Sequence, residues 1–176
     1  MALTEGASIP LRLRPGGRVV GSIGPETEFG SEVILSVVGK RGPWLGVLTP
    51  ELSNGQIGWI RFDPGKMERA WTKYVIKVDT SAQEMTLRYS GKILSRHTVT
   101  VGAVGSETPT GRFAVTDAID YGASAAYGCC ALALTGHQPK TPVGWLGGNR
   151  IAIHGTPGAV GGAASYGCVR STKRRC

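Results

Sequence analysis

The residue types best suited to chemistry in this sequence are one histidine and one cysteine near its carboxyl end. His154 closes the apolar run Ile151-Ala152-Ile153, and Cys168 follows 14 positions later. An imidazole that takes the proton of a thiol makes the thiolate that attacks a carbonyl group. The resulting imidazolium can then protonate a departing amine. These residue types therefore predict nucleophilic acyl transfer.

The neighbours of Cys168 suit the same reaction. Gly167 removes a side chain that would obstruct an incoming carbonyl group. The N–H groups of Gly167 and Cys168 can point at the developing oxyanion. Arg170 lies on the same side of an extended chain as Cys168, where it can hold a substrate carboxylate or brace the loop.

Each of these residues also has a purely structural interpretation. Cys168 can be a buried apolar thiol, His154 a hydrogen-bonded residue at a strand end, and Arg170 a solvated surface charge. The combination of all three favours the catalytic interpretation. His97 and His137 have no such neighbours, so we interpret both as structural.

The elements that must position these residues are predicted to be strands. In Ile151 to His154 the period of two sends Ile151 and Ile153 to one face and Ala152 and His154 to the other. The glycine- and alanine-rich segment from Pro157 to Ala164 can let the chain fold back, which would bring His154 and Cys168 together.

The composition indicates a turn-rich, all-β protein. Glycine occupies 27 of 176 positions, and 41% of the residues are hydrophobic. The apolar runs expected to form strands are 33–38, 44–48, 57–60, 74–79, 85–89, 92–101, 112–116, 131–135 and 149–154, with Asn54-Gly55 as a hairpin signal. A short helix can be accommodated only at 123–127. The polar segment 63–69 places a domain boundary near residue 70, which gives domains 1–70 and 71–176.

The charge balance limits the partners. The chain has 20 Lys+Arg and 12 Asp+Glu, a net charge of +8, and most of the excess follows Arg69. An anionic wall polymer, a membrane surface or nucleic acid would each be attracted. No nucleic-acid motif appears, and the basic residues are scattered except at Arg170, Lys173, Arg174 and Arg175, so we expect no nucleic-acid partner. No apolar run is long enough for a membrane span, and no signal sequence is present in this chain.

The four cysteines are Cys129, Cys130, Cys168 and Cys176. They are too few for a disulfide scaffold, and no Cys-x-x-Cys pair points to zinc. We therefore expect no metal and no organic cofactor. At least one of Cys129 and Cys130 is expected to be a buried small hydrophobe.

Two segments of the chain resemble known families. Gly42-Pro43-Trp44-Leu45-Gly46-Val47, followed by Asn54-Gly55-Gln56-Ile57-Gly58-Trp59-Ile60, resembles the bacterial SH3-like domains that occur beside cell-wall enzymes. This resemblance implies an amino-terminal SH3-like barrel that either fills its core with Trp44 and Trp59 or binds a ligand with them.

The second segment is similar to the L,D-transpeptidases. His154-Gly155-Thr156 and Ser165-Tyr166-Gly167-Cys168-Val169-Arg170 resemble the catalytic signature of that family, and Thr108-Pro109-Thr110-Gly111-Arg112-Phe113 resembles its Thr-Pro-x-Gly-x-Phe turn. The resemblance implies a catalytic β-sandwich. It also implies that Cys168 is the nucleophile, His154 the base and Gly167 the oxyanion-hole glycine, with Arg170, Tyr166, Ser165, Gly155 and Thr156 around the substrate.

The implied reaction is peptidoglycan cross-linking. In the family, the thiolate attacks the carbonyl of the third residue of a tetrapeptide stem and releases D-alanine, and an amine of another stem then forms a 3→3 cross-link. Carbapenem-type β-lactams are implied inhibitors, because they acylate the same thiol. The family connection also implies a role in cell shape and export to the cell wall or periplasm.

Three features depart from the family pattern. Tyr166 stands where many members have a second histidine. No Asp or Glu lies near His154 in the sequence, so a backbone carbonyl is the expected orienting partner. The chain also ends soon after Arg170, where members normally continue, so the catalytic domain is expected to be shortened. Two alternatives stay open: a wall-binding protein with an impaired catalytic domain, and a thiol hydrolase of the L,D-carboxypeptidase type.

Overall fold

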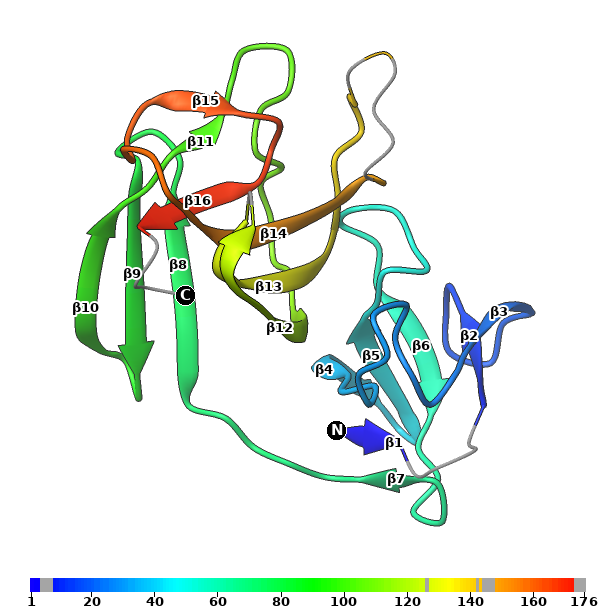
Figure 1. Ribbon diagram of the computed structural model, residues 1–176. Helices are drawn as coiled ribbons and strands as arrows, with labels where there is room; N and C mark the ends of the chain where they lie inside the picture. Colours follow the sequence, from blue (N-terminus) through cyan, green and yellow to red (C-terminus); the bar gives the residue numbers. More distant parts are fainter. Residues whose placement is uncertain (4–7, 126, 142, 144–147, 173–176) are drawn as a thin grey trace. The chain divides into compact units, whose positions relative to one another are not determined.

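A computed structural model describes residues 1–3, 8–125, 127–141, 143 and 148–172. Throughout these ranges the regular secondary structure consists of β-strands, and no helix is present (Figure 1). The predicted all-β fold is therefore confirmed. The segment 123–127, which the sequence allowed to hold a short helix, begins with the last residues of β12, which continues to Ala125. Among the described residues, no helix has the length and apolarity needed to cross a membrane.

The chain forms two compact units. Unit 1 comprises Met1–Trp71 together with Gly111–Asp117 and Leu134–Gly136, and unit 2 comprises the remaining segments. The division into domains 1–70 and 71–176 stays a prediction, since unit 1 also takes in two short segments from later in the chain.

Unit 1 is built on a five-stranded antiparallel sheet. The strands of this unit are β1 (Ala2–Leu3), β2 (Ile9–Arg12), β3 (Val19–Ile23), β4 (Ser36–Arg41), β5 (Trp44–Leu48), β6 (Gly58–Arg61) and β7 (Met67–Glu68). The order in the sheet is β3-β2-β6-β5-β4, and β1 pairs separately with β7. Burial alternates along β2 and β6, as expected for an antiparallel sheet with one buried face, whereas the last four residues of β5 are all buried.

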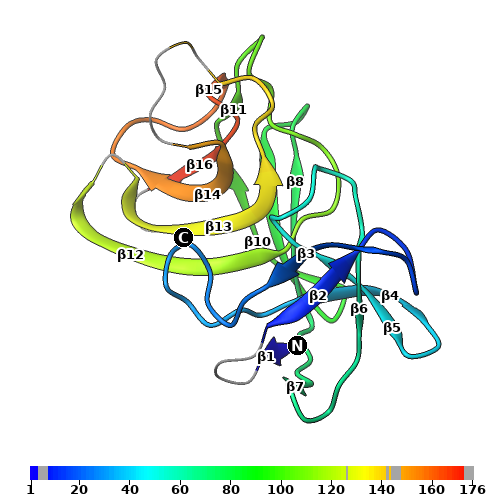
Figure 2. The ribbon, with the colours of Figure 1, turned by 90° about the vertical axis from the view of Figure 1, so that its right-hand side faces the viewer.

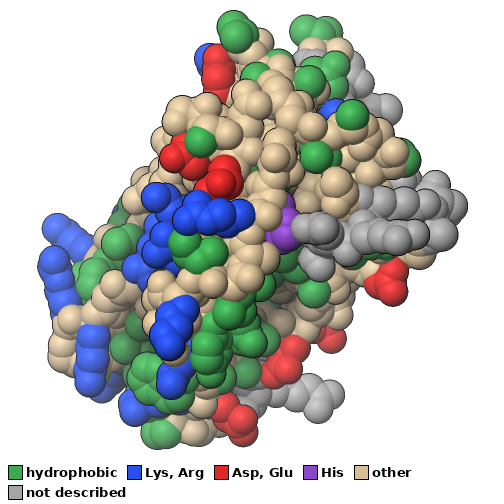
Figure 3. Space-filling view, turned by 90° about the vertical axis from the view of Figure 1, so that its left-hand side faces the viewer, with side chains coloured by type: hydrophobic (Ala, Val, Ile, Leu, Met, Phe, Trp, Pro, Cys, Tyr) green, Lys and Arg blue, Asp and Glu red, His purple; other side chains and the backbone are tan. Residues whose placement is uncertain are grey.

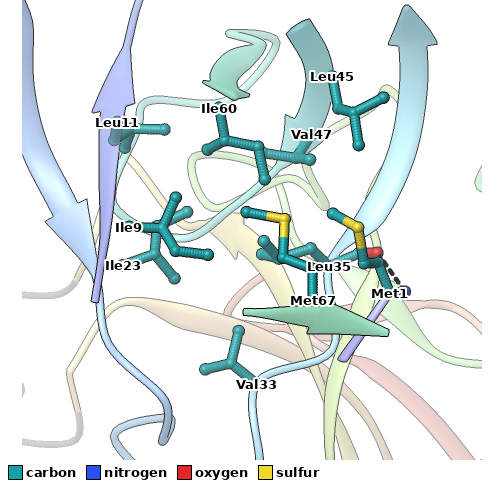
Figure 4. Close-up of a cluster of buried hydrophobic side chains, with 10 residues drawn as sticks. All are labelled: Met1, Ile9, Leu11, Ile23, Val33, Leu35, Leu45, Val47, Ile60 and Met67. Carbon is teal, nitrogen blue, oxygen red and sulfur yellow. Dashed lines mark hydrogen bonds between the residues drawn. The ribbon is translucent and has the colours of Figure 1, made fainter. Parts of the chain in front are cut away.

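The core of unit 1 is a cluster of ten buried hydrophobic side chains (Figure 4). Val47 and Ile60 are completely buried at its centre. Full burial of a side chain of this size contributes about 1.5–3 kcal/mol relative to exposure. Val33 and Leu35, expected on a strand at 33–38, belong to this cluster, but the strand itself begins at Ser36.

The two tryptophans of unit 1 do not belong to the buried cluster. Trp44 and Trp59 are half-buried. Arg12 lies over the Trp44 ring at 5.1 Å and Arg41 over the Trp59 ring at 5.3 Å. β5 and β6 pair as predicted, with Trp44 opposite Arg61, although Asn54-Gly55 lies in a nine-residue connection and not in a two-residue hairpin loop.

Unit 2 carries the second set of strands. These are β8 (Tyr74–Asp79), β9 (Glu84–Tyr89), β10 (Lys92–Thr98), β11 (Val101–Gly102), β12 (Val115–Ala125), β13 (Gly128–His137), β14 (Arg150–Thr156), β15 (Ala163–Ser165) and β16 (Val169–Thr172). The first residues of β12 and three residues near the end of β13 belong to unit 1. β10, β9 and β8 form a meander, and β11 pairs with β15. The predicted strand at 112–116 begins only at Val115, and the predicted strand at 92–101 is divided into β10 and β11.

The sheet that matters for the chemistry has four strands in the order β12-β13-β14-β16, and it is strongly curved (Figure 2). β13 and β14 are antiparallel, whereas β14 and β16 are parallel. Parallel neighbours need a crossover of about a dozen residues or more. Residues 157–168 supply this crossover, which explains the distance in sequence between His154 and Cys168.

Candidate active site

His154 and Cys168 are brought to one face of the sheet by the parallel pair β14 and β16. The register places Ile153 beside Val169 and His154 beside Arg170. Extending the ladder back by one residue places Cys168 beside Ala152. Because side chains alternate, His154, Cys168 and Arg170 share a face. Buried Ile151, Ile153 and Val169 point to the opposite face, as the period of two predicted.

The imidazole of His154 is held by the backbone of the next residue. His154 is 4% exposed, and its Nδ1 lies 2.7 Å from the carbonyl oxygen of Gly155. A carbonyl oxygen only accepts, so Nδ1 carries the proton and Nε2 is left as a proton acceptor. The orienting partner is thus a backbone carbonyl, as the sequence led us to expect.

The thiol of Cys168 is half-buried at the end of a tight loop. Ser165, which is 1% exposed, donates its hydroxyl to the Cys168 carbonyl oxygen at 2.5 Å. The same hydroxyl oxygen accepts the Gly167 N–H at 3.2 Å. The Ser165 hydroxyl therefore shapes the loop, and the Gly167 N–H, which we expected to face the oxyanion, is directed at Ser165.

The electrostatics of the site favour a neutral thiol beside a neutral imidazole. Burial raises the pKa of the Cys168 thiol, against the lowering by a backbone hydrogen bond from Ala152 and by the charge of Arg170. Burial also lowers the pKa of His154; the Gly155 hydrogen bond opposes this shift, and Arg170 adds to it. The sequence suggested a thiolate–imidazolium pair, but both shifts disfavour the charged forms at rest.

Gln138 is a residue of the site that the sequence did not indicate. It is 5% exposed, and its Nε2 lies within 3.1 Å of the carbonyl oxygens of Ser106 and Glu107 and 3.3 Å from that of Tyr166. A Cβ at Gly167 would lie 2.2 Å from this Nε2. Gln138 therefore ties the 106–107 turn to the loop of Cys168, and only glycine fits at position 167.

Arg170 is half-buried beside His154, and its backbone is fixed from two directions. Its N–H and carbonyl group exchange hydrogen bonds with Thr100, both at 2.9 Å. Its charge lowers the pKa of both Cys168 and His154. Arg170 therefore supplies the positive charge that acts on both Cys168 and His154.

The remaining predicted site residues lie at different depths. Tyr166, in the loop that precedes Cys168, is 53% exposed, whereas Gly155 is buried. Thr156 is half-buried, and its Oγ1 accepts the Gly158 N–H at 3.4 Å. Within the described ranges, no group of three or more His, Cys, Asp or Glu residues is arranged to hold a metal ion.

Two further features near the site differ from what the sequence indicated. Tyr127, which no motif singled out, lies against His154, with the ring centroids 4.9 Å apart. Cys129 and Cys130 are both half-buried, with their sulfur atoms 3.0 Å apart, so the expectation that at least one of them is buried was wrong.

Comparisons with known proteins identify the second part of the chain. The family model for the YkuD L,D-transpeptidase catalytic domain matches residues 73–175. A curated Bacillus subtilis (strain 168) protein named "Putative L,D-transpeptidase YkuD" is 27% identical over 113 residues. The match covers 61% of this chain and 58% of the length of that relative.

Proposed function

Because this chain belongs to the L,D-transpeptidase catalytic domain family, we propose that it is a cysteine acyltransferase acting on peptidoglycan stem peptides. Cys168 is the nucleophile and His154 the general base. The observation that carries the assignment is the β14–β16 register, which puts both side chains on one face while Gly155 holds the imidazole with Nε2 unprotonated.

The first half of the reaction forms a thioester. As the thiol proton moves to His154 Nε2, Sγ attacks the carbonyl carbon of the third stem residue. The carbon–nitrogen bond to the terminal D-alanine then breaks, and the imidazolium returns the proton to the departing amine. Because the Gly167 N–H is engaged with Ser165, we assign the Cys168 N–H to the developing oxyanion.

The second half transfers the acyl group. An amine from a second stem attacks the thioester, loses its proton to His154 and releases the thiol, which gives a 3→3 cross-link. Water in place of the amine would give L,D-carboxypeptidase activity. We assign to Tyr166, which is exposed at the loop, the role of covering the bound stem.

The charge of the chain supports an anionic wall polymer as substrate. The meander β8 to β10 carries Lys77, Arg88, Lys92 and Arg96 against only two carboxylates. Basic side chains gather on the face of the molecule shown in Figure 3. A positive surface attracts a polymer that bears carboxylates and phosphates. We accordingly propose a location at the cell wall or in the periplasm.

We propose that unit 1 is an SH3-like domain. Its five-stranded antiparallel sheet around a single core supports this assignment, as does the pairing of the two tryptophan-bearing strands.

The test is product analysis by mass spectrometry with a disaccharide-tetrapeptide substrate. Cross-linked dimer together with free D-alanine supports transpeptidation, whereas free D-alanine with tripeptide and no dimer indicates a hydrolase. Binding with no turnover indicates a wall-binding protein.

Acylation by a carbapenem is a second measurement on the same protein. We expect an intact-mass adduct on the wild type and on Cys129→Ala, but not on Cys168→Ala. Cys129 is the matched control because it is a second cysteine of unit 2 that is half-buried like Cys168. An adduct that persists in Cys168→Ala would remove Cys168 from the mechanism.

A further inference from the structure

Three aromatic rings form a row that ends at the candidate base. Tyr127 lies in the turn between β12 and β13 and is half-buried. Its ring meets the imidazole of His154 nearly at a right angle, with centroids 4.9 Å apart and planes inclined by 80°. Tyr121 stacks on the other side of Tyr127, with centroids 5.6 Å apart and planes inclined by 27°.

The backbone is built to bring Tyr127 to this place. Gly128, the next residue, has a φ of 68°, and a Cβ there would lie 2.7 Å from the carbonyl carbon of Gly155. The turn between β12 and β13 can approach the end of β14 this closely only because position 128 is glycine. Gly155 also supplies the carbonyl oxygen that accepts the His154 Nδ1–H. The backbone contact between Gly128 and Gly155 therefore joins the two residues that hold the imidazole of His154: Gly155, which accepts its hydrogen bond, and Tyr127, whose ring lies against it.

The ring contact and the hydrogen bond constrain the imidazole differently. The hydrogen bond to Gly155 selects the tautomer and leaves Nε2 as the base. The perpendicular ring of Tyr127 opposes rotation of the imidazole about its Cβ–Cγ bond, since a rotated imidazole would collide with it. The same ring keeps water from one side of His154.

We propose that Tyr127 is a positioning residue that fixes the orientation of the His154 imidazole and shields it from water, so that His154 stays a neutral base for Cys168. The part of this inference that concerns catalysis rests on the proposed function. The orientation and the neutral state of His154 do not.

Three titratable or charged side chains lie around the imidazole. Tyr127 faces it from the β12–β13 turn, and Arg170 from β16, while Cys168 shares its face of the sheet. Burial raises the pKa of the Tyr127 phenol, and the negative charge of an ionised Cys168 adds to that shift, so Tyr127 stays neutral. Arg170 disfavours the imidazolium by its positive charge.

The experiment is an NMR titration of His154 in the full chain, with its Cε1–H signal assigned by its loss in His154→Asn. The variants are Tyr127→Phe, Tyr127→Leu and Tyr127→Ala, and Tyr121→Ala is the matched control that removes the outer ring. We expect Tyr127→Phe and Tyr121→Ala to titrate like the wild type, because the ring against the imidazole is retained. In Tyr127→Ala the pKa of His154 moves up, because water reaches the imidazole.

The second measurement is the rate of Cys168 alkylation by iodoacetamide as a function of pH, read from the mass of the Cys168 peptide. Tyr127→Leu keeps apolar bulk but lacks a ring, so we expect a slower rate at neutral pH, by roughly tenfold, with little change in the pKa of His154. If Tyr127→Ala and Tyr127→Leu both reproduce the wild-type titration and rate, the inference is overturned. It is equally overturned if Tyr127→Phe is as impaired as Tyr127→Ala, since the hydroxyl and not the ring would then matter.

Neither measurement uses a peptidoglycan substrate. If the protein forms no cross-links but the titration and alkylation results are as expected, the proposed function alone is refuted. If it forms cross-links but the Tyr127 variants titrate and react like the wild type, the role of Tyr127 alone is refuted.

Discussion

Replacing Gly167 by alanine should damage this site more than the same change at another glycine of similar backbone conformation. Gly167 has a φ of 101°, where alanine costs about 1–2 kcal/mol. The new Cβ would also lie 2.2 Å from Nε2 of Gln138, so the amide must move away from the carbonyl oxygens that it contacts. The amide nitrogen of Gln138 has two N–H donors, and the loss of its two hydrogen bonds adds about 2 kcal/mol. The expected loss in the free energy of unfolding is about 3–4 kcal/mol.

Two matched variants separate the backbone cost from the collision. Gly162 has a φ of 78°, and a Cβ added there would meet nothing within 4 Å, so Gly162→Ala should lose only about 1–2 kcal/mol. Gln138→Ala removes the three atoms that a Cβ at position 167 would meet. In that background Gly167→Ala should again cost only about 1–2 kcal/mol, which gives a coupling energy of about 2 kcal/mol between the two positions.

The assay is urea denaturation of the wild type and these variants, together with the rate of Cys168 alkylation. We expect Gly167→Ala to slow alkylation roughly 100-fold, because the displaced loop moves the thiol away from His154. The reasoning is refuted if Gly167→Ala costs no more than Gly162→Ala, or if Gln138→Ala leaves the cost of Gly167→Ala unchanged.

Further predictions concern ionisation and the loop. Alkylation of Cys168 should rise with pH through a higher midpoint than that of an ordinary cysteine, because its pKa is raised by burial; a midpoint at or below the ordinary value would contradict this. Arg170→Gln should raise the pKa of both Cys168 and His154, measured by alkylation and by NMR titration, whereas Arg170→Lys should shift them less. Ser165→Ala should lower the free energy of unfolding by about 1–3 kcal/mol in urea denaturation, because it leaves the Gly167 N–H without its acceptor. Stability should fall below pH 6.5 through His154, because its folded-state pKa is lowered and the unfolded state binds the proton more readily; His154→Asn should flatten this part of the pH profile.

The sequence predicted those features of the site that depend on local periodicity. The alternation in Ile151 to His154 gave the correct face for the histidine, because two buried isoleucines must share the core side of a strand. The apolar run at 44–48 and the Asn54-Gly55 signal predicted that strand and its pairing with β6. It misplaced the strand at 33–38, since Val33 and Leu35 are buried by the core of unit 1 and not by membership of a sheet strand.

Features that depend on contacts between distant segments could not be predicted from single motifs. Gln138 is separated from Gly167 by 29 positions, and nothing in its neighbourhood indicates that a glutamine there is buried. Tyr127 reaches His154 only because Gly128, which has no Cβ, lets its backbone touch that of Gly155. The ionisation of the site was also beyond the sequence, because burial, which sets the direction of both shifts, is a property of the folded chain.

A neutral thiol beside a neutral imidazole changes which step the site assists most. Arg170 lowers the pKa of both groups, so it makes the thiol more acidic and the imidazole less basic, and its two effects on proton transfer between them largely cancel. After the transfer, however, the same charge makes the His154 imidazolium a stronger acid. A stronger acid protonates a departing amine more readily. On this argument Arg170 contributes more to the release of D-alanine than to the attack by sulfur, and Arg170→Gln should slow formation of the thioester from a stem peptide more than acylation by a carbapenem, whose ring opening expels no amine into solution.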